Sequence, residues 1–152
     1  MSTGTVVSIN IAADRGQPMR PVPQVRAVAG RGLEGDRFFR TDASEAEPRP
    51  DREVTLIEVE AIEALAREHG VHLEPKDARR NIVTRGVALN DLVGREFTVG
   101  EVRLRGLRLC EPCTHLAQLT DERVLPGLVH RGGLRAQVLN DGLIRVGDPV
   151  RP

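Results

Sequence analysis

The chain has 152 residues, enough for one domain with a hydrophobic core and no need of disulfide bonds. Its 22 basic and 22 acidic residues give a formal net charge of zero, so no overall field attracts nucleic acid or an anionic membrane. It shows no apolar stretch of membrane-spanning length and no secretory signal pattern. We therefore expect a single domain over residues 1–152 in the reducing cytoplasm, with neither nucleic acid nor a membrane as partner.

Two strands and a constrained turn are predicted in the first third of the chain. The β-branched run TVVSINI is typical of a strand, and PVPQVRAVAG indicates a second strand that ends at a glycine. Three glycines then follow within six residues, which indicates a tight turn with special backbone angles: Gly30, Gly32 and Gly35.

A charged pair and a polar loop follow this turn. Asp36 and Arg37 could cap the turn, pair with each other, or contribute to a phosphate site. Because no Lys-Ser/Thr ending follows, the segment does not match a P-loop. The polar, proline-containing residues 40–52 predict an exposed, flexible loop.

The clearest helix signal lies in EVTLIEVEAIEALAREHG. A short strand at residues 53–57 leads into a helix that stops at Gly70. Glu63 and Arg67 have the spacing of an ion pair on the outer side of this helix. Its inner face is predicted to carry Ile62, Leu65, Ala66 and His69.

Short strands dominate the second half of the chain. RNIVTRG predicts a strand, and EFTVGEVRLRGLRL predicts a hairpin that turns at Val99-Gly100-Glu101. LRAQVLNDGLIRVGD predicts another hairpin, with Asn140-Asp141-Gly142 as its turn. Many short strands with one main helix favour a mainly β fold, built as an antiparallel, curved or closed sheet.

Both cysteines of the chain lie in CEPC, at Cys110 and Cys113. They could supply half of a zinc site, although no second ligand pair follows at a finger-like spacing. They could form a redox dithiol, a motif that normally sits at a strand-to-helix junction of a βαβ unit. They could also be two small buried hydrophobic residues. Pro112 stiffens the turn after the predicted strand, so a thiol there can point into a pocket.

A second candidate site is the segment DARRNIVTRG. If a strand already runs through its arginines, Arg79 and Asn81 share one face and Arg80 takes the other. An arginine and an amide side by side suit a phosphate or a planar heterocycle, but a plain surface arginine pair explains the pattern equally well. His115 and His130 could each line a pocket.

Five segments in order resemble the MOSC domain family, named for the C-terminal part of molybdenum-cofactor sulfurases. They are GRGLEGDR, VTLIEVEAIEAL, RRNIVTRGVALNDLVGREFTVGEVRLRG, CEPCTHL and RGGLRAQVLNDGLIRVGDPV. The resemblance implies an antiparallel, barrel-like MOSC fold with one main helix and short helical turns, of the compact, stand-alone bacterial type. It also implies a positively lined pocket for the pterin and phosphate of molybdenum cofactor.

The resemblance also implies roles for single residues. Cys113 matches the cysteine that ligates molybdenum, so it becomes the predicted catalytic residue and metal ligand. The other residues that the resemblance assigns to cofactor binding are Arg79, Asn81, Arg37, Glu111 and Pro112. Glu111 departs from the family pattern because it adds an acid beside an anionic cofactor, which the sequence alone does not explain.

The function implied is the reduction of a small N-hydroxylated base or amine, with electrons from a separate donor protein. The alternative is a non-catalytic carrier or sulfur-transfer module that holds the cofactor or a cysteine persulfide. Lys76 is the only lysine and lies in a loop-like EPKD, and the chain has no pyridoxal-phosphate domain. No pyridoxal phosphate is therefore expected on this chain.

Overall fold

The computed structural model describes residues 2–41 and 49–152 of the chain. Most of the loop predicted at residues 40–52 lies outside the described residues, and its end forms a short 3₁₀ helix, η1, at Pro50–Arg52. The strands are β1 Gly4–Ile11, β2 Arg20–Pro21, β3 Gln24–Val28, β4 Gly32–Leu33, β5 Val54–Glu58, β6 Ile82–Arg85, β7 Glu96–Val99, β8 Val102–Leu109, β9 Leu134–Val138, β10 Gly142–Arg145 and β11 Pro149–Arg151. The helices are α1 Val59–His69, α2 Thr114–Leu119 and α3 Val124–Gly127, with further 3₁₀ turns η2 Pro75–Ala78 and η3 Leu89–Leu92.

Seven strands form a closed barrel in the order β11-β7-β8-β9-β5-β6-β1, and β1 pairs with β11 to close it. β2 extends β1 outside this ring, and β10, β3 and β4 form a small separate sheet. The predicted mainly β barrel is thus confirmed. Orientation is mixed, because β5 and β6 pair in parallel while their neighbours in the barrel are antiparallel. A parallel pair needs a crossover connection, and α1 provides it.

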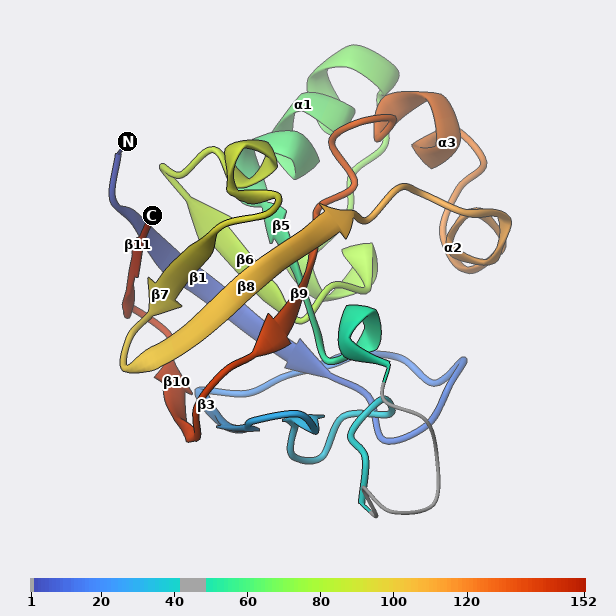
Figure 1. Cartoon of the computed structure of the whole chain (residues 1–152). Helices are drawn as coiled ribbons and strands as arrows, with labels where there is room; N and C mark the ends of the chain where they lie inside the picture. Colours follow the sequence, from blue (N-terminus) through green and yellow to red (C-terminus); the bar gives the residue numbers. More distant parts are fainter. Residues whose placement is uncertain (1, 42–48) are drawn as a thin grey trace.

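The three helices gather on one side of the barrel, and the small β3–β10 sheet lies on the opposite side (Figure 1). The predicted main helix is confirmed as α1, which ends at Gly70 with a left-handed φ of 69°. The predicted Glu63–Arg67 pair is wrong: Glu63 bonds Arg85 of β6 at 3.0 Å instead. Arg85 reaches Glu63 because β6 runs beside the helix. Within the described ranges, no helix is long and apolar enough to span a membrane.

Two apolar clusters stabilise the fold, one on each side of the barrel wall. Leu56 of β5 and Ile82 of β6 belong to the cluster that fills the barrel. Their neighbours Ile57 and Val83 face the other way, against α1 and the other helices. This alternation follows from the two-residue period of a strand. Because aliphatic side chains fill the barrel, a ligand must bind outside it.

The hairpin predicted at Asn140-Asp141-Gly142 does not form. β9 pairs with β5 and β8, whereas β10 pairs with β3 in the small sheet. Side chains of the connecting residues bind other segments: Asn140 accepts from the Arg103 amide at 2.6 Å, and Asp141 accepts from the Ala29 amide at 2.8 Å. These contacts direct the chain from one sheet to the other. The hairpin at Gly100 is confirmed by the pairing of β7 with β8.

Candidate functional site

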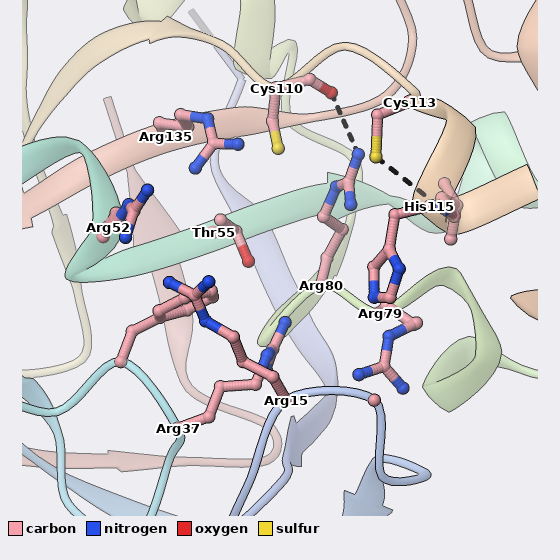
Figure 2. A pocket seen from close by; sticks show the side chains of 13 residues that line it. Arg15, Arg37, Arg52, Thr55, Arg79, Arg80, Cys110, Cys113, His115 and Arg135 are labelled. Atoms are coloured by element: carbon pink, nitrogen blue, oxygen red, sulfur yellow. Dashed lines mark hydrogen bonds between the residues drawn. The ribbon is translucent and has the colours of Figure 1, made fainter.

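A pocket of about 410 Å³ opens on the outer face of the barrel wall beside Thr55 of β5. Figure 2 shows side chains from several separate segments arranged around Thr55. Among the described residues that line it there is no aspartate or glutamate. Six arginines line it: Arg15, Arg37, Arg52, Arg79, Arg80 and Arg135. A chain with no net charge thus concentrates positive charge in one place.

The segment that joins β8 to α2 brings both cysteines to this pocket, but with different exposure. Cys110 is 1% exposed, and its backbone N–H donates to the Gly133 carbonyl at 2.7 Å. Cys113 is exposed and directly precedes α2, where its Sγ accepts from the Leu116 N–H at 3.5 Å. Of the two thiols, only that of Cys113 is therefore exposed. The assignment of Cys113 as a metal ligand stays a prediction.

Arg80 lies directly beneath the cysteine segment. It is 7% exposed, and its guanidinium donates to the carbonyls of Gly132 at 2.7 Å and Cys110 at 3.2 Å. It has no ion pair with a described carboxylate, and burial lowers the pKa of Arg80. Negative charge on Cys110 or Cys113 acts in the opposite direction and raises this pKa. Arg80 therefore fixes the position of the cysteines and favours an anion or a thiolate beside them.

The strand geometry predicted for Arg79 and Asn81 is wrong. β6 begins only at Ile82, and Arg79 has a left-handed φ of 59° at the end of η2. As a result both Arg79 and Arg80 line the pocket, although alternation placed them on opposite faces. Arg79 donates to the Gln17 carbonyl at 2.7 Å, and burial, followed by repulsion from Arg37, lowers its pKa.

Asn81 lies behind the pocket wall and does not line it. Its Oδ1 accepts from the backbone N–H of Thr55 at 3.1 Å and from the Thr55 hydroxyl at 3.2 Å. Its Nδ2 donates to the Asn10 carbonyl at 3.2 Å. Both ends of the amide are therefore engaged inside the protein, so any effect of Asn81 on a ligand passes through the position of Thr55.

Arg37 reaches the pocket from the glycine turn, whose three glycines all have positive φ values, between 71° and 107°. It donates to Asp36 at 3.0 Å, so of the alternatives that the sequence left open for this pair, mutual pairing is observed. Asp36 also accepts from the Ala12 N–H at 3.2 Å, which anchors the turn to the end of β1. Arg37 is thus a fixed part of the wall, although its charge is partly balanced by Asp36.

Glu111 and Pro112, both predicted to contact the cofactor, do not line the pocket. The Glu111 carboxylate accepts from the His130 N–H at 2.7 Å and lies 3.0 Å from His130 Nδ1. Pro112 packs near Gly132, where a Cβ would collide with the Cys110 carbonyl. Glu111 therefore links the segment after β8 to the loop that contains His130, outside the pocket. This placement explains how an acidic residue can follow Cys110 without opposing an anionic ligand.

Sequence reasoning missed Arg15 and Arg52 and gave Arg80 no role. Arginine carried little information, because all basic residues except Lys76 are arginines. Of the two histidines considered, His115 lines the pocket and His130 does not. The local sequence around Arg15 or Arg52 contains no signal of a site, because only tertiary folding brings these residues to the pocket.

A metal site made entirely of protein ligands is not present in the part of the chain that the structure describes. No three His, Cys, Asp or Glu side chains gather there as a group that could hold a metal ion. The zinc site considered for CEPC thus lacks further ligands.

Comparisons with known proteins identify the family of this chain. The MOSC domain model matches residues 40–151, which includes the cysteine segment, η2 and all barrel strands except β1. The chain belongs to the MOSC domain family. No curated protein matches it at a significant level.

Solved structures of bacterial proteins share this MOSC fold. The YuaD protein from Bacillus subtilis has a TM-score of 0.83 at 17% identity, and the match covers 99% of this chain and 97% of that one. YiiM from Geobacillus stearothermophilus has a TM-score of 0.72 at 19% identity, covering 97% and 74% of the two chains. YiiM from Escherichia coli has a TM-score of 0.68 at 20% identity, covering 99% and 69%. At these identities the likeness concerns the fold alone.

Proposed function

We propose that this MOSC domain binds molybdenum cofactor in the arginine-lined pocket, with the Cys113 thiolate as the protein ligand to molybdenum. One observation carries the proposal: an exposed thiol opens into a pocket whose charged lining residues, among those described, are all basic. Family membership supports it, because MOSC domains are associated with this cofactor.

The side chains present fit an anionic, sulfur-rich cofactor. Arg80 is buried without a described carboxylate partner, and the buried Nε of Arg135 has no hydrogen-bond partner among the described residues. A buried donor without an acceptor costs free energy, which a phosphate or another anion recovers. A soft thiolate suits a sulfur-bound, redox-active metal better than a carboxylate does.

Each residue then has a defined task. Cys113 supplies the thiolate, since a metal ion removes the proton from a thiol that coordinates it. Arg79, Arg80 and Arg135 neutralise the anionic groups of the cofactor. Arg80 also holds the Cys110 carbonyl and thereby the turn that presents Cys113. When bound, the cofactor supplies two-electron oxo transfer at molybdenum.

We further propose that the reaction is the reduction of a small N-hydroxylated base or amine. Breaking the N–O bond consumes two electrons and two protons, and releases water and the reduced substrate. The electrons come from a separate donor protein, because the sequence carries no recognisable flavin, haem or iron–sulfur motif. Cys113 and His115 line the same pocket, so a substrate that reaches the metal lies beside an imidazole.

The test is expression in a host that makes molybdenum cofactor, followed by measurement of molybdenum per chain and of N-hydroxylated substrate reduction. We expect the wild type to carry the metal and Cys113→Ala to lose it. Cys110→Ala is the matched control, because it removes the buried thiol and should keep the metal. Equal molybdenum content in Cys113→Ala and the wild type would contradict the ligand assignment.

A second candidate function is sulfur transfer, favoured by the presence of both cysteines at one pocket. In this case one cysteine holds a persulfide that a separate sulfur donor supplies. Cyanide-labile sulfur on the purified protein, together with bound cofactor but no substrate reduction, would favour sulfur transfer over reduction.

A further inference from the structure

A second hollow, which we name the Phe38 hollow, adjoins the pocket just described. It has a volume of about 490 Å³ and adds Phe39, Arg40 and Arg49 to residues that it shares with the first pocket. The shared residues are Arg15, Arg37, Phe38 and Arg52. Because the same side chains line both spaces, one ligand can extend from the first pocket into the second.

Arginines make up five of the seven described residues that line the Phe38 hollow. Among the described residues, none of the salt bridges engages Arg15, Arg49 or Arg52. Burial, followed by repulsion from Arg49 and Arg15, lowers the pKa of Arg52. Like charges held this close cost free energy, which a bound anion removes.

Phe38 gives the hollow an aromatic surface in a chain that has three phenylalanines and no tryptophan or tyrosine. Its half-buried ring lies 4.7 Å from the guanidinium carbon of Arg37, 5.2 Å from that of Arg15 and 5.7 Å from that of Arg52. Aromatic and guanidinium planes stack on heterocyclic bases, and guanidinium forks bind phosphate. The two features together match a nucleotide better than an isolated phosphate.

The proposed function assigns no anionic group of the cofactor to Arg15, Arg49 or Arg52. Arg80 donates to the Cys110 carbonyl, and Arg135 lies beside Cys110 (Figure 2). Together with Arg79, these arginines match the anionic groups of a single pterin phosphate. Arg49 lines only the Phe38 hollow, and Arg15 and Arg52 line both spaces. A second phosphate on the Phe38 side accounts for this additional positive charge.

We propose that the Phe38 hollow binds a nucleotide, with its phosphate held by Arg15, Arg49 and Arg52 and its base stacked on the Arg37 guanidinium that lies over Phe38. This binding needs neither the metal nor Cys113. Two sources share the chemistry: a nucleotide attached to the cofactor, or a phosphorylated substrate whose N-hydroxylated base reaches the metal. The choice between these sources rests on the proposed function.

The experiment is calorimetric titration of the metal-free protein with AMP, and with adenosine as the probe that lacks phosphate. We expect AMP to bind wild type, adenosine to bind at least about tenfold more weakly, and Arg49→Gln and Phe38→Leu to weaken AMP binding by about tenfold. Arg151→Gln, an exposed position on β11, is the matched control and should bind AMP as wild type does. AMP affinity that is undetectable in wild type, or unchanged in both variants at unchanged melting temperature, overturns the proposal.

Loaded protein separates the two sources. Mass spectrometry of the released cofactor reveals an attached nucleotide, whereas a higher kcat/KM for an N-hydroxylated nucleotide than for its free base assigns the hollow to the substrate. Finding neither overturns the link between this hollow and the molybdenum reaction. AMP binding in a protein that never takes up molybdenum would instead refute the proposed function and leave the nucleotide site standing. Molybdenum uptake without AMP binding would overturn the nucleotide site and leave the proposed function standing.

Discussion

The inner and outer faces of β5 have opposite surroundings. Val54 and Leu56 point into the barrel and are fully buried among aliphatic side chains. Thr55, between them, faces the pocket where the arginines gather. The inner face gains free energy from every apolar contact, whereas the outer face keeps buried cations that cost free energy without an anion. One strand therefore supports stability on one side and ligand binding on the other.

The largest effect on stability is expected from the inner face. Leu56→Ala removes a fully buried side chain and should lower the free energy of unfolding by about 2–5 kcal/mol, measured by urea denaturation. Leu119→Ala, at a site that is 43% exposed, is the control and should change it by less than about 0.5 kcal/mol. Equal effects of the two substitutions would contradict the assignment of the barrel interior as the main core.

Substitutions at the outer face should change ligand binding more than they change stability. Arg80→Met removes the buried cation and leaves the carbonyls of Gly132 and Cys110 without a donor. Molybdenum content should fall by about tenfold, with about 1–3 kcal/mol lost in unfolding free energy. Arg103→Met, at an exposed position on β8, should leave both quantities near wild type. Full molybdenum content in Arg80→Met would show that the buried charge does not serve the ligand.

A substitution at Glu53 shows whether the protein needs a buried charge away from the ligand for its stability. Burial raises the pKa of Glu53 above its ordinary value of 4.5, although its carboxylate accepts from the Val138 N–H at 2.8 Å. A carboxyl whose pKa rises on folding stabilises the protein below its unfolded-state pKa, and this contribution is lost as pH rises through the folded-state pKa. Glu53→Gln keeps the acceptor and avoids the buried charge.

We therefore expect Glu53→Gln to be more stable than wild type at neutral pH, on the order of 1 kcal/mol, and equal to it in acid. Urea unfolding at several pH values on both sides of 4.5 measures the difference. Glu34→Gln, at an exposed position, is the control and should stay close to wild type in stability. A Glu53→Gln variant that is less stable than wild type at neutral pH would refute the sign of this argument.

The smallest effect is expected at Glu111. Its bond to His130 is largely exposed, so Glu111→Gln should lower the unfolding free energy by less than about 1 kcal/mol. Molybdenum content should not change, because Glu111 lies outside the pocket. A large loss of molybdenum would restore the direct cofactor contact that the sequence pattern predicted.

Much of the barrel could be predicted because its signals are local. The helix at α1, its stop at Gly70 and the β7–β8 hairpin all follow from patterns within a few residues. The order of the strands and the β9-to-β10 connection could not be predicted in this way. Asn140 and Asp141 have a hairpin sequence, but their side chains bind segments far away in the chain.

The site was predicted less completely because loops build it. The stiff Pro112 indicated that a thiol beside it can point into a pocket, and Cys113 is exposed at the pocket. The choice of Cys113 over Cys110 came from the family resemblance. Arg79 and Arg80 were predicted on opposite faces because a strand was assumed to run through them. The strand starts only at Ile82, and the left-handed backbone of Arg79 lets both side chains line the pocket. Arg15 and Arg52 come together over Phe38 only through tertiary contacts. No short window of the sequence contains that information.

The central claim is that Cys113 binds the metal, and X-ray absorption at the molybdenum edge tests it most directly. Loaded wild-type protein and Cys113→Ser, both reconstituted with the same cofactor, would be compared for the number of sulfur atoms around molybdenum. We predict that Cys113→Ser loses one sulfur neighbour while Cys110→Ser keeps the wild-type number. The same sulfur count in wild type and Cys113→Ser would contradict the claim.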